Sequence, residues 1–340
     1  MKNVVIIGGG FAGSTIAREL ESKFNVTLID NKPYFEFTPG ILRSIAHPTK
    51  SRCMQQRHED YLKSTKILVG SVSRIGKNYV LVENKKIHFD YLVIATGSSY
   101  KAPFKHPQLF AASRSDELAR YNRYIVDGKH VLIIGSGLVG VELAGEIAHY
   151  YCGKKVTLVS SNKYLLDRMP QKARDYAHKK LVEMGVEVIF DERVVKNKNK
   201  IFTTLKNLRV NGDIGFMCTG IVPNTSFLDK KMLDDKGFLK VDYNLRLVGY
   251  DNIFAAGDIT NINEEKTGQN AEKQAKVVLQ NILRLSQSRK LVDYKSVKSP
   301  IVISLGPRNG IFIWGNFVFT GMIPALLKWA VEKKELMKRR

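Results

Sequence analysis

Apolar and small residues occur in the same order in two stretches of the chain. The apolar run Val4–Ile7 precedes a glycine-rich turn, a segment with helical spacing of apolar residues and a second apolar run, Val26–Ile29. The same order recurs between Val131–Ile134 and Val156–Val159. Continuous apolar runs are typical of parallel strands that are covered on both faces. The pattern therefore predicts two strand–turn–helix–strand units.

Both turns have the spacing G-x-G-x-x-G. The first contains Gly8, Gly10 and Gly13, with Phe11 and Ala12 between the last two. In such a turn the first glycine permits the bend, the second lets a pyrophosphate approach the backbone, and the third lets the helix pack closely on the strand. The phosphates bind at the helix N-terminus, where free N–H groups favour anions. We expect one nucleotide here and another at the matching turn, which contains Gly135, Gly137, Leu138, Val139 and Gly140.

The two units differ in the residue that ends their second strand. In the first unit this residue is Asp30, followed by Asn31 and Lys32, and its carboxylate is well placed to accept hydrogen bonds from ribose hydroxyls. In the second unit it is Ser160, with Lys163 close behind. A carboxylate at this place would repel a 2′-phosphate, so its absence makes NADPH acceptable as well as NADH.

Several further strands end in small residues. The strand that ends in Ala95-Thr96-Gly97 is repeated by one that ends in Thr219-Gly220, so the repeat is larger than the glycine turn. A third strand ends in Gly257-Asp258. The spacing of apolar residues predicts helices over 170–185 and 267–285.

The length and charge of the chain limit the classes of function. At 340 residues the chain is long enough for two domains with separate cores. Its net charge of +22 favours an acidic partner, such as an anionic membrane face, nucleic acid, a phosphorylated ligand or an acidic protein. The alternative is a lysine bias of the source proteome.

Three cysteines, Cys53, Cys152 and Cys218, are far apart and form no Cys-x-x-Cys pair. We therefore expect no local redox dithiol and no metal site, but buried thiols in a reducing compartment. Because a strand begins at once, no signal peptide is expected, and Lys2 excludes an N-myristoylation start.

The order of these motifs resembles flavoproteins with two dinucleotide-binding domains, the relatives of the pyridine-nucleotide–disulfide reductases. The resemblance implies an α/β fold with two Rossmann-like domains, the second inserted in the first, as in glutathione reductase. Residues 1–103 and 223–299 would bind FAD, residues 104–222 would bind NAD(P)H, and residues 300–340 would form a C-terminal strand and amphipathic helix. FAD would be tightly bound and NADH or NADPH would be the substrate.

The resemblance also assigns site residues. Ala95, Thr96, Gly97, Gly257 and Asp258 would line the FAD site, with Asp258 on the ribityl–phosphate arm of the flavin. Without a suitably spaced cysteine pair, the disulfide and sulfide:quinone branches do not fit. The stretches Lys32–Leu42, including Thr38 and Pro39, and Thr267–Gln274 instead resemble type II NADH dehydrogenases and the ferroptosis-suppressor and apoptosis-inducing-factor-like quinone reductases.

Four polar residues are catalytic candidates by this resemblance. Gln269 and Gln274 would lie beside the flavin and the quinone, unless they only cap their helix. Glu142 would lie near the nicotinamide, with a solvated helical glutamate as the alternative. Lys266 would face the pyrimidine edge of the flavin, with a surface lysine as the alternative.

The end of the chain is apolar and then basic. Residues 311–331 approach the length of a membrane span, but Gly315, Asn316, Gly321 and Pro324 interrupt them, so we expect no single spanning helix. From Pro324 to Arg340 the pattern predicts an interfacial helix. Its apolar residues are Leu326, Leu327, Trp329, Ala330, Val331, Leu336 and Met337, and its polar face includes Lys328, Lys333, Lys334, Lys338, Arg339 and Arg340. The alternatives are docking on the protein's own core or on a second subunit, as in a homodimer.

Together these observations predict an FAD-dependent NAD(P)H:quinone oxidoreductase that pumps no protons. It would be cytoplasmic and peripheral on the inner face of a membrane. One alternative is a soluble reductase that passes electrons to ferredoxin or rubredoxin. Another is an apoptosis-inducing-factor-like protein that binds nucleic acid or a partner, although no zinc-finger spacing or aromatic-studded basic strand favours nucleic acid.

Overall fold

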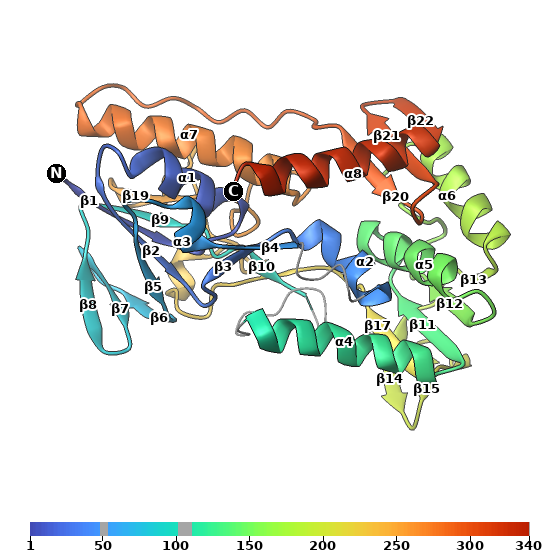
Figure 1. Cartoon of the computed structure of the whole chain (residues 1–340). Helices are drawn as coiled ribbons and strands as arrows, with labels where there is room; N and C mark the ends of the chain where they lie inside the picture. Colours follow the sequence, from blue (N-terminus) through green and yellow to red (C-terminus); the bar gives the residue numbers. More distant parts are fainter. Residues whose placement is uncertain (48–53, 101–110, 340) are drawn as a thin grey trace.

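The computed structural model describes residues 1–47, 54–100 and 111–339 and contains two parallel sheets (Figure 1). The first sheet has the strand order β19-β9-β1-β2-β5. Its strands are β1 (Asn3–Ile7), β2 (Asn25–Asp30), β5 (Lys66–Val69), β9 (Tyr91–Ile94) and β19 (Ile253–Ala255). We call the part of the chain built on this sheet the first half.

The second sheet is formed by residues that lie between β9 and β19 in the sequence. Its order is β13-β12-β11-β17, and the strands are β11 (His130–Ile134), β12 (Lys155–Val159), β13 (Val186–Ile189) and β17 (Ile214–Met217). We call this part the second half. In each half, the strand before the glycine turn lies between the strand after the first helix and the strand that ends in Thr-Gly. The prediction of two Rossmann-like units is confirmed, whereas the expected domain boundary at 103/104 lies outside the described residues.

Alternation along β1 explains how both faces of the first sheet are covered. Val4 and Ile6 pack with residues of α1 (Phe11–Leu20) and α7 (Gly268–Ser286), the two helices on one face. Val5 and Ile7 pack on the other face, against a three-stranded sheet. That sheet is formed by β6 (Val72–Ile75), β7 (Tyr79–Val82) and β8 (Lys85–His88).

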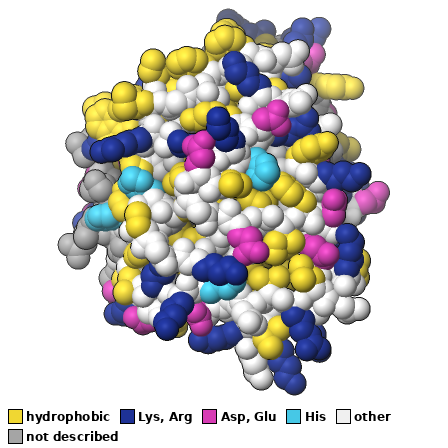
Figure 2. Space-filling model, turned by 90° about the vertical axis from the view of Figure 1, so that its right-hand side faces the viewer, with side chains coloured by type: hydrophobic (Ala, Val, Ile, Leu, Met, Phe, Trp, Pro, Cys, Tyr) yellow, Lys and Arg dark blue, Asp and Glu magenta, His cyan; other side chains and the backbone are white. Residues whose placement is uncertain are grey.

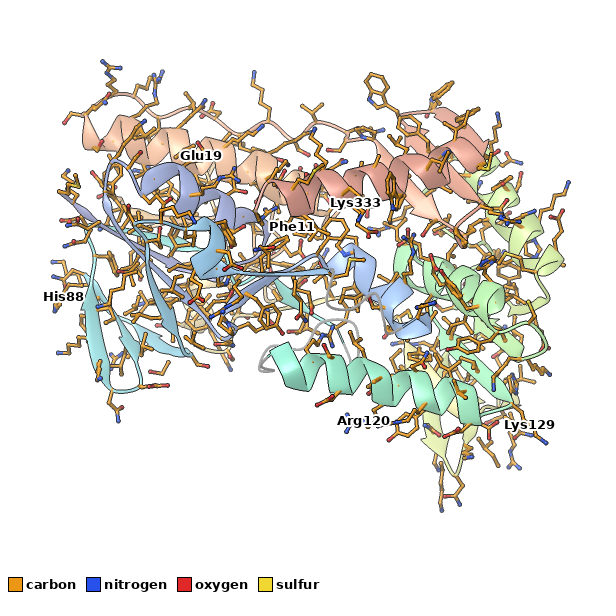
Figure 3. All side chains as sticks on the ribbon, in the orientation of Figure 1. Phe11, Glu19, His88, Arg120, Lys129 and Lys333 are labelled. Atoms are coloured by element: carbon orange, nitrogen blue, oxygen red, sulfur yellow. The ribbon has the colours of Figure 1, made fainter. Side chains whose placement is uncertain are left out.

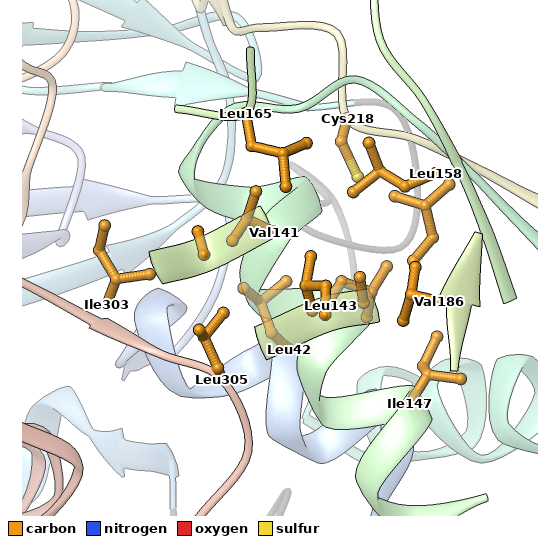
Figure 4. Close-up of a cluster of buried hydrophobic side chains, with 14 of the residues drawn as sticks. Leu42, Val141, Leu143, Ile147, Leu158, Leu165, Val186, Cys218, Ile303 and Leu305 are labelled. Carbon is orange, nitrogen blue, oxygen red and sulfur yellow. The ribbon is translucent and has the colours of Figure 1, made fainter. Parts of the chain in front are cut away.

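The core of the second half also includes residues from distant parts of the chain. Val141, Leu143 and Ile147 of α5 (Leu138–Tyr150) pack against the sheet, as Figure 4 shows. Leu42 of α2 (Ile41–Ala46) and Leu305 join the same cluster. Other elements of this region are α4 (Ala111–Asp127), α6 (Gln171–Glu183), β14 (Val194–Lys198), β15 (Ile201–Thr204) and β16 (Arg209–Asn211).

The chain crosses between the halves through a pair of short antiparallel strands, β10 (Ser98–Ser99) and β18 (Val222–Pro223). Ser98 is opposite Pro223 in this pairing. Next to it, the Thr96 hydroxyl donates to the Asn224 carbonyl (2.9 Å) and the Asn224 amide donates to the Thr96 carbonyl (2.8 Å). Both crossings therefore lie side by side.

Small elements of the first half are β3 (Tyr34–Glu36), the 3-10 helix η1 (Thr38–Gly40), β4 (Gln55–Arg57), α3 (His58–Tyr61) and η3 (Lys230–Met232).

The last segment forms a three-stranded sheet and a helix. β20 (Ile301–Ser304), β21 (Gly310–Trp314) and β22 (Phe317–Gly321) pack against the second half, and α8 (Met322–Met337) then runs back toward the first half (Figure 1). The helix begins at Met322, two residues before the expected start at Pro324. Proline is tolerated in the first turn because the backbone N–H that it lacks would have no partner within the helix there. Among the helices that the structure describes, none is long and apolar enough to cross a membrane.

Candidate functional site

The first glycine turn has the geometry that its spacing predicts. Gly8 has φ +98°, and a Cβ atom there would lie 2.4 Å from the carbonyl oxygen of Ala95. A Cβ atom on Gly13 would lie 1.8 Å from the carbonyl oxygen of Gly8. At Gly10, by contrast, an added Cβ would meet no atom of the described chain within 4 Å. The backbone around Gly8 and Gly13 therefore leaves no room for a side chain. The space beside Gly10 is open and has room for a pyrophosphate.

The second turn repeats this geometry. Gly135 has φ +112°, and its added Cβ would lie 2.5 Å from the carbonyl oxygen of Cys218. Gly140 would clash with the Gly135 carbonyl at 1.9 Å, while Gly137 faces a space free of described atoms within 4 Å. Leu138 and Val139 begin α5. Two equivalent helix N-termini are thus available to nucleotide phosphates.

Asp30 is held at the end of β2 by backbone donors. Its Oδ2 accepts a hydrogen bond from the Gly9 N–H (2.6 Å) and its Oδ1 accepts one from the Lys32 N–H (3.0 Å). Burial raises the pKa of this carboxyl, but Lys32 and His58 together outweigh burial and lower the pKa to about 2. The neighbouring Asn31 accepts a hydrogen bond from the Ser71 hydroxyl. Asp30 is therefore ionised at neutral pH and ready to accept hydrogen bonds from a ribose.

Gly9 and His58 belong to this site although the sequence did not single them out. A Cβ atom on Gly9 would lie 2.4 Å from Cε1 of His58 and 2.5 Å from Oδ2 of Asp30. The His58 side chain is fully buried, with Nε2 3.4 Å from Asp30 Oδ2 and Nδ1 2.6 Å from the Tyr61 hydroxyl. The run of three glycines, Gly8 to Gly10, is the signal that could have identified Gly9, whereas nothing local identifies His58.

The other strand ends of the first half meet at the same edge. A Cβ atom on Gly257 would contact Cβ of Ala12 at 3.7 Å, so β19 ends against the first turn of α1. Asp258 accepts a hydrogen bond from the Ser98 hydroxyl (2.6 Å), next to Gly97, which has φ +64°. The structure therefore brings together the residues that the resemblance assigned to FAD.

Aromatic rings close the site on the side of β3. The Phe11 ring, at the start of α1, packs edge-on against Phe35 (5.1 Å between centroids) and Phe37 (5.8 Å). Thr38 and Pro39 follow in η1 and are partly exposed. The stretch that resembles quinone reductases thus lies beside the first turn of α1.

The two glutamine candidates occupy different environments on α7. Gln269 is exposed on the first turn. Gln274 is buried: its Oε1 accepts a hydrogen bond from the Gly257 N–H (2.8 Å), and its Nε2 donates to Glu264 Oε1 (2.7 Å). These contacts favour an internal role for Gln274 in the connection from β19 to α7, rather than a contact with a quinone.

Lys266 is partly buried and binds the same connection. Its ammonium donates to the carbonyl oxygens of Thr260 (2.6 Å) and Ile262 (3.0 Å). Burial lowers the pKa of Lys266, against the opposing effects of Asp258 and Glu264. Lys266 is therefore not a free surface lysine. Two of its three N–H donors form hydrogen bonds with the loop that follows Asp258.

Glu142 is neither solvated nor free. Its Oε1 accepts hydrogen bonds from the Ser304 N–H (2.9 Å) and from the Lys328 ammonium (2.5 Å), so it links α5 to β20 and α8. This contact corrects the prediction that Lys328 faces lipid head groups. Lys338 and Arg339, predicted on the same polar face, also turn inward and pair with Glu272 and Glu335.

The second half has hydroxyl groups where the first has a carboxylate. Ser160 is fully buried, and its Oγ lies 2.7 Å from Oγ of Ser136 and accepts a hydrogen bond from the Asn162 N–H (3.0 Å). Thr219 and Gly220 follow β17 and are exposed, with Gly220 at φ +103°. The residue that follows β12, Ser160, therefore carries no charge, unlike Asp30 in the first half.

The cysteines do not form a redox centre in the described chain. Cys218 is buried, which raises the pKa of its thiol. Cys152 is exposed, so the prediction of a buried thiol is wrong there. Cys53 lies outside the described residues. Within those residues, no group of three or more His, Cys, Asp and Glu side chains could hold a metal ion.

The chain is similar to known proteins over most of its length. The family model described as pyridine nucleotide-disulphide oxidoreductase matches residues 2–275. The chain belongs to this family. It is 32% identical to apoptosis-inducing factor homolog B of Dictyostelium discoideum, over 91% of this chain and 89% of that protein. It is 29% identical to ferroptosis suppressor protein 1 of Taeniopygia guttata, over 91% of this chain and 87% of that protein.

The fold of this pyridine nucleotide-disulphide oxidoreductase is shared with a solved structure of NDH2 from Plasmodium falciparum in complex with NADH. The TM-score is 0.85 and the identity 16%, over 99% of this chain and 96% of that chain. The protein is therefore an oxidoreductase that uses FAD and NAD(P)H. The openings at Gly10 and Gly137 leave room for two dinucleotides.

Proposed function

We propose that the protein is a membrane-peripheral NAD(P)H:quinone oxidoreductase. The observation that supports this acceptor most strongly is an exposed apolar face formed by α8 and the β21–β22 hairpin. Its members, which we call the apolar face, are Trp314, Phe317, Phe319, Met322, Ile323, Leu326, Leu327 and Trp329. Hydrophobic side chains gather along the upper edge of the molecule in Figure 2, the edge at which these elements lie in Figure 1.

The apolar face is unusual for a surface in contact with water. Ile323 is 63% exposed, and both Trp314 and Phe317 are 62% exposed. Contiguous apolar patches of this kind mark sites of contact with a membrane or another protein. Tryptophan and phenylalanine beside exposed lysines, here Lys333 and Lys334, are typical of elements that lie in the membrane interface. The net charge of +22 adds attraction to anionic head groups.

The inner side of α8 connects this face with the nucleotide sites. Lys328 pairs with Glu142 on α5, the helix whose N-terminus follows the second glycine turn. A quinone dissolved in lipid would thus arrive at an element that contacts the NAD(P)H-binding half directly. When bound, FAD supplies the chemistry that accepts a hydride from NAD(P)H and passes two electrons to the acceptor.

The protein's own residues hold and orient the two dinucleotides. Asp30 provides a fixed negative acceptor for the FAD ribose, and the open positions at Gly10 and Gly137 admit the pyrophosphates. The likeness of Lys32–Leu42 to type II NADH dehydrogenases supports the same acceptor.

A stopped-flow experiment tests the acceptor. The purified protein is reduced with NADH or NADPH and then mixed with a ubiquinone analogue, a menaquinone analogue or ferredoxin, while the flavin absorbance is followed. We expect rapid return of the yellow colour with a quinone and none with ferredoxin. Reoxidation by ferredoxin alone would support the soluble-reductase alternative, for which the positive charge would also be suited.

A flotation experiment tests the membrane contact. We expect the protein to float with phosphatidylcholine vesicles that contain phosphatidylglycerol, and less so at high salt. The double variant Trp314→Ser/Ile323→Ser should stay with the soluble fraction. The matched control is Tyr243→Ser, which replaces an 81% exposed ring outside the apolar face. If the wild type does not float but sediments as a dimer that the double variant abolishes, the apolar face is a subunit interface instead.

A further inference from the structure

Arg339, two residues after α8, lies against helices of the first half, which we propose to bind FAD. Arg339 is only 2% exposed. Its Nε donates to the Ser14 hydroxyl on α1 (3.2 Å), and its Nη2 lies 3.4 Å from Glu272 Oε1 on α7. Its Nη1 donates to the carbonyl oxygen of Glu335 (3.1 Å) on its own helix. A guanidinium is thus inserted between two helices that belong to a different part of the fold.

The same guanidinium covers the aromatic cluster of the FAD site. It lies 3.9 Å from the centroid of the Phe35 ring and 5.7 Å from that of Phe11. Figure 3 shows Phe11 directly below the end of α8. The Phe11 ring also lies close to the start of α7. A Cβ atom added to Gly268, the first residue of that helix, would be 2.9 Å from the ring. Arg339 therefore contacts α1 and the two elements that pack against its first turn, β3 and α7.

Further contacts fix the backbone around Arg339. The Arg18 guanidinium donates to the carbonyl oxygen of Lys338 (2.6 Å), and the Lys338 ammonium pairs with Glu272 (3.1 Å) and with Glu335. The cations Lys338 and Arg339 thus pair with the carboxylates Glu272 and Glu335, which offsets much of the cost of burying these charges. A buried and fully paired cation of this kind defines one position for its neighbours.

We propose that Arg339 is a positioning residue for FAD: it holds the Phe11 and Phe35 rings and the first turn of α1 in the arrangement that binds the FAD pyrophosphate. Arg339 acts through these side chains and makes no contact with the flavin. The inference rests on FAD binding, not on the electron acceptor, so it stands or fails independently of quinone reduction.

The test is the affinity of the FAD-free protein for added FAD, measured by the quenching of flavin fluorescence. For Arg339→Ala we expect FAD to bind about tenfold more weakly, the loss expected for one desolvated cation–π contact. Arg339→Lys should give a smaller loss, because lysine keeps the charge but lacks the planar fork that stacks and bonds at once. The matched control is Lys334→Ala, which removes an exposed cation from the same helix and should leave FAD binding unchanged.

A second measurement separates positioning from general unfolding. NADH binding at the second half and the melting temperature of the FAD-free protein are measured for the same variants. We expect NADH affinity to stay close to wild type in both variants, whereas the melting temperature of Arg339→Ala should fall because Glu272 and Glu335 lose a buried cation. If Arg339→Ala does not fold, Glu272→Gln weakens the same cluster from α7, and it should also reduce FAD affinity without changing NADH affinity. Equal FAD affinity in Arg339→Ala and Lys334→Ala, or a parallel loss of FAD and NADH binding, would overturn the proposal.

Discussion

In the first half, which we propose to bind FAD, the residue after the first glycine of the turn is Gly9, whose N–H donates to the carboxylate of Asp30. In the second half, which we propose to bind NAD(P)H, the matching residue is Ser136, whose hydroxyl lies 2.7 Å from that of Ser160. The glycine geometry is otherwise the same in both halves, from the positive φ of the first glycine to the open second one. In the proposed function, the shared part would bind pyrophosphate and the different part would meet the adenosine ribose.

The two halves use the same fold for two purposes. The first half adds a fixed negative charge, a buried histidine and an aromatic cluster that Arg339 covers, and these extra contacts suit a cofactor that stays bound. The second half offers a neutral, hydroxyl-lined strand end, which suits a substrate that must leave after each turnover.

The largest effect is expected from alanine at the first glycine of each turn. Gly8→Ala and Gly135→Ala both force a side chain onto a positive φ and within 2.5 Å of a backbone carbonyl. Strain of this kind costs about 3 kcal/mol, or roughly a hundredfold in affinity. We expect Gly8→Ala to be purified without FAD, and Gly135→Ala to stay yellow but to lose NADH binding, as measured by calorimetry. Loss of FAD from both variants would show that the halves do not bind independently.

Asp30→Asn tests the fixed charge in the first half. The pKa of Asp30 is lowered from 3.8 to about 2 in the folded protein. A lowered pKa stabilises the fold above pH 3.8, and this contribution is lost as the pH falls toward 2. It amounts to about 2 kcal/mol of unfolding free energy. Urea unfolding of the FAD-free protein at about pH 6 and about pH 3 should therefore show a smaller pH effect in Asp30→Asn than in the wild type.

The control for this measurement is Asp90→Asn. Asp90 also accepts a backbone hydrogen bond, from the Asn3 N–H, but it is exposed. The Asp90→Asn variant should show the same difference in unfolding free energy between the two pH values as the wild type. A wild-type pH effect in Asp30→Asn would mean that Asp30 is not the group that titrates.

Ser160→Asp tests the neutral strand end in the second half. A carboxylate there would repel the 2′-phosphate of NADPH, while NADH has none. We expect NADPH to bind about tenfold more weakly, a change of roughly 1.4 kcal/mol, with little change for NADH. Calorimetric titration of the yellow protein with each nucleotide measures this, and Ser161→Asp, at the exposed neighbour, is the control. An equal loss for both nucleotides would indicate a packing defect instead.

The smallest effect, with the opposite sign, is expected from Glu146→Gln. Burial raises the pKa of Glu146, against the effect of Arg43, and its Oε2 has no hydrogen-bond partner among the described residues. A raised carboxyl pKa means that stability falls as the pH rises from 4.5 toward the folded-state value. The glutamine variant should lose this decline, which urea unfolding between about pH 4 and about pH 7 detects. A steeper decline in the variant would contradict this assignment.

The sequence was sufficient for the sheets and the glycine turns because their signals are local. Gly8, Gly13 and the apolar run before them lie within ten residues, so spacing alone defines their geometry. His58 could not be found this way, because it reaches Asp30 from 28 residues away and only the fold brings them together. Gln274 and Lys328 show a second limit: helical spacing indicates which face is polar, but not that buried partners such as Gly257 and Glu142 occupy that face.

The paired crossing strands have a consequence for how this family diversifies. Because Ser98 is opposite Pro223, the inserted half leaves and re-enters the chain at neighbouring points, about 5 Å apart as in any antiparallel pair. A shorter insert, or one with another binding preference, could be grafted between these two residues without altering the strand order of the outer sheet. Donor preference and flavin retention can therefore evolve as separable modules of a single polypeptide.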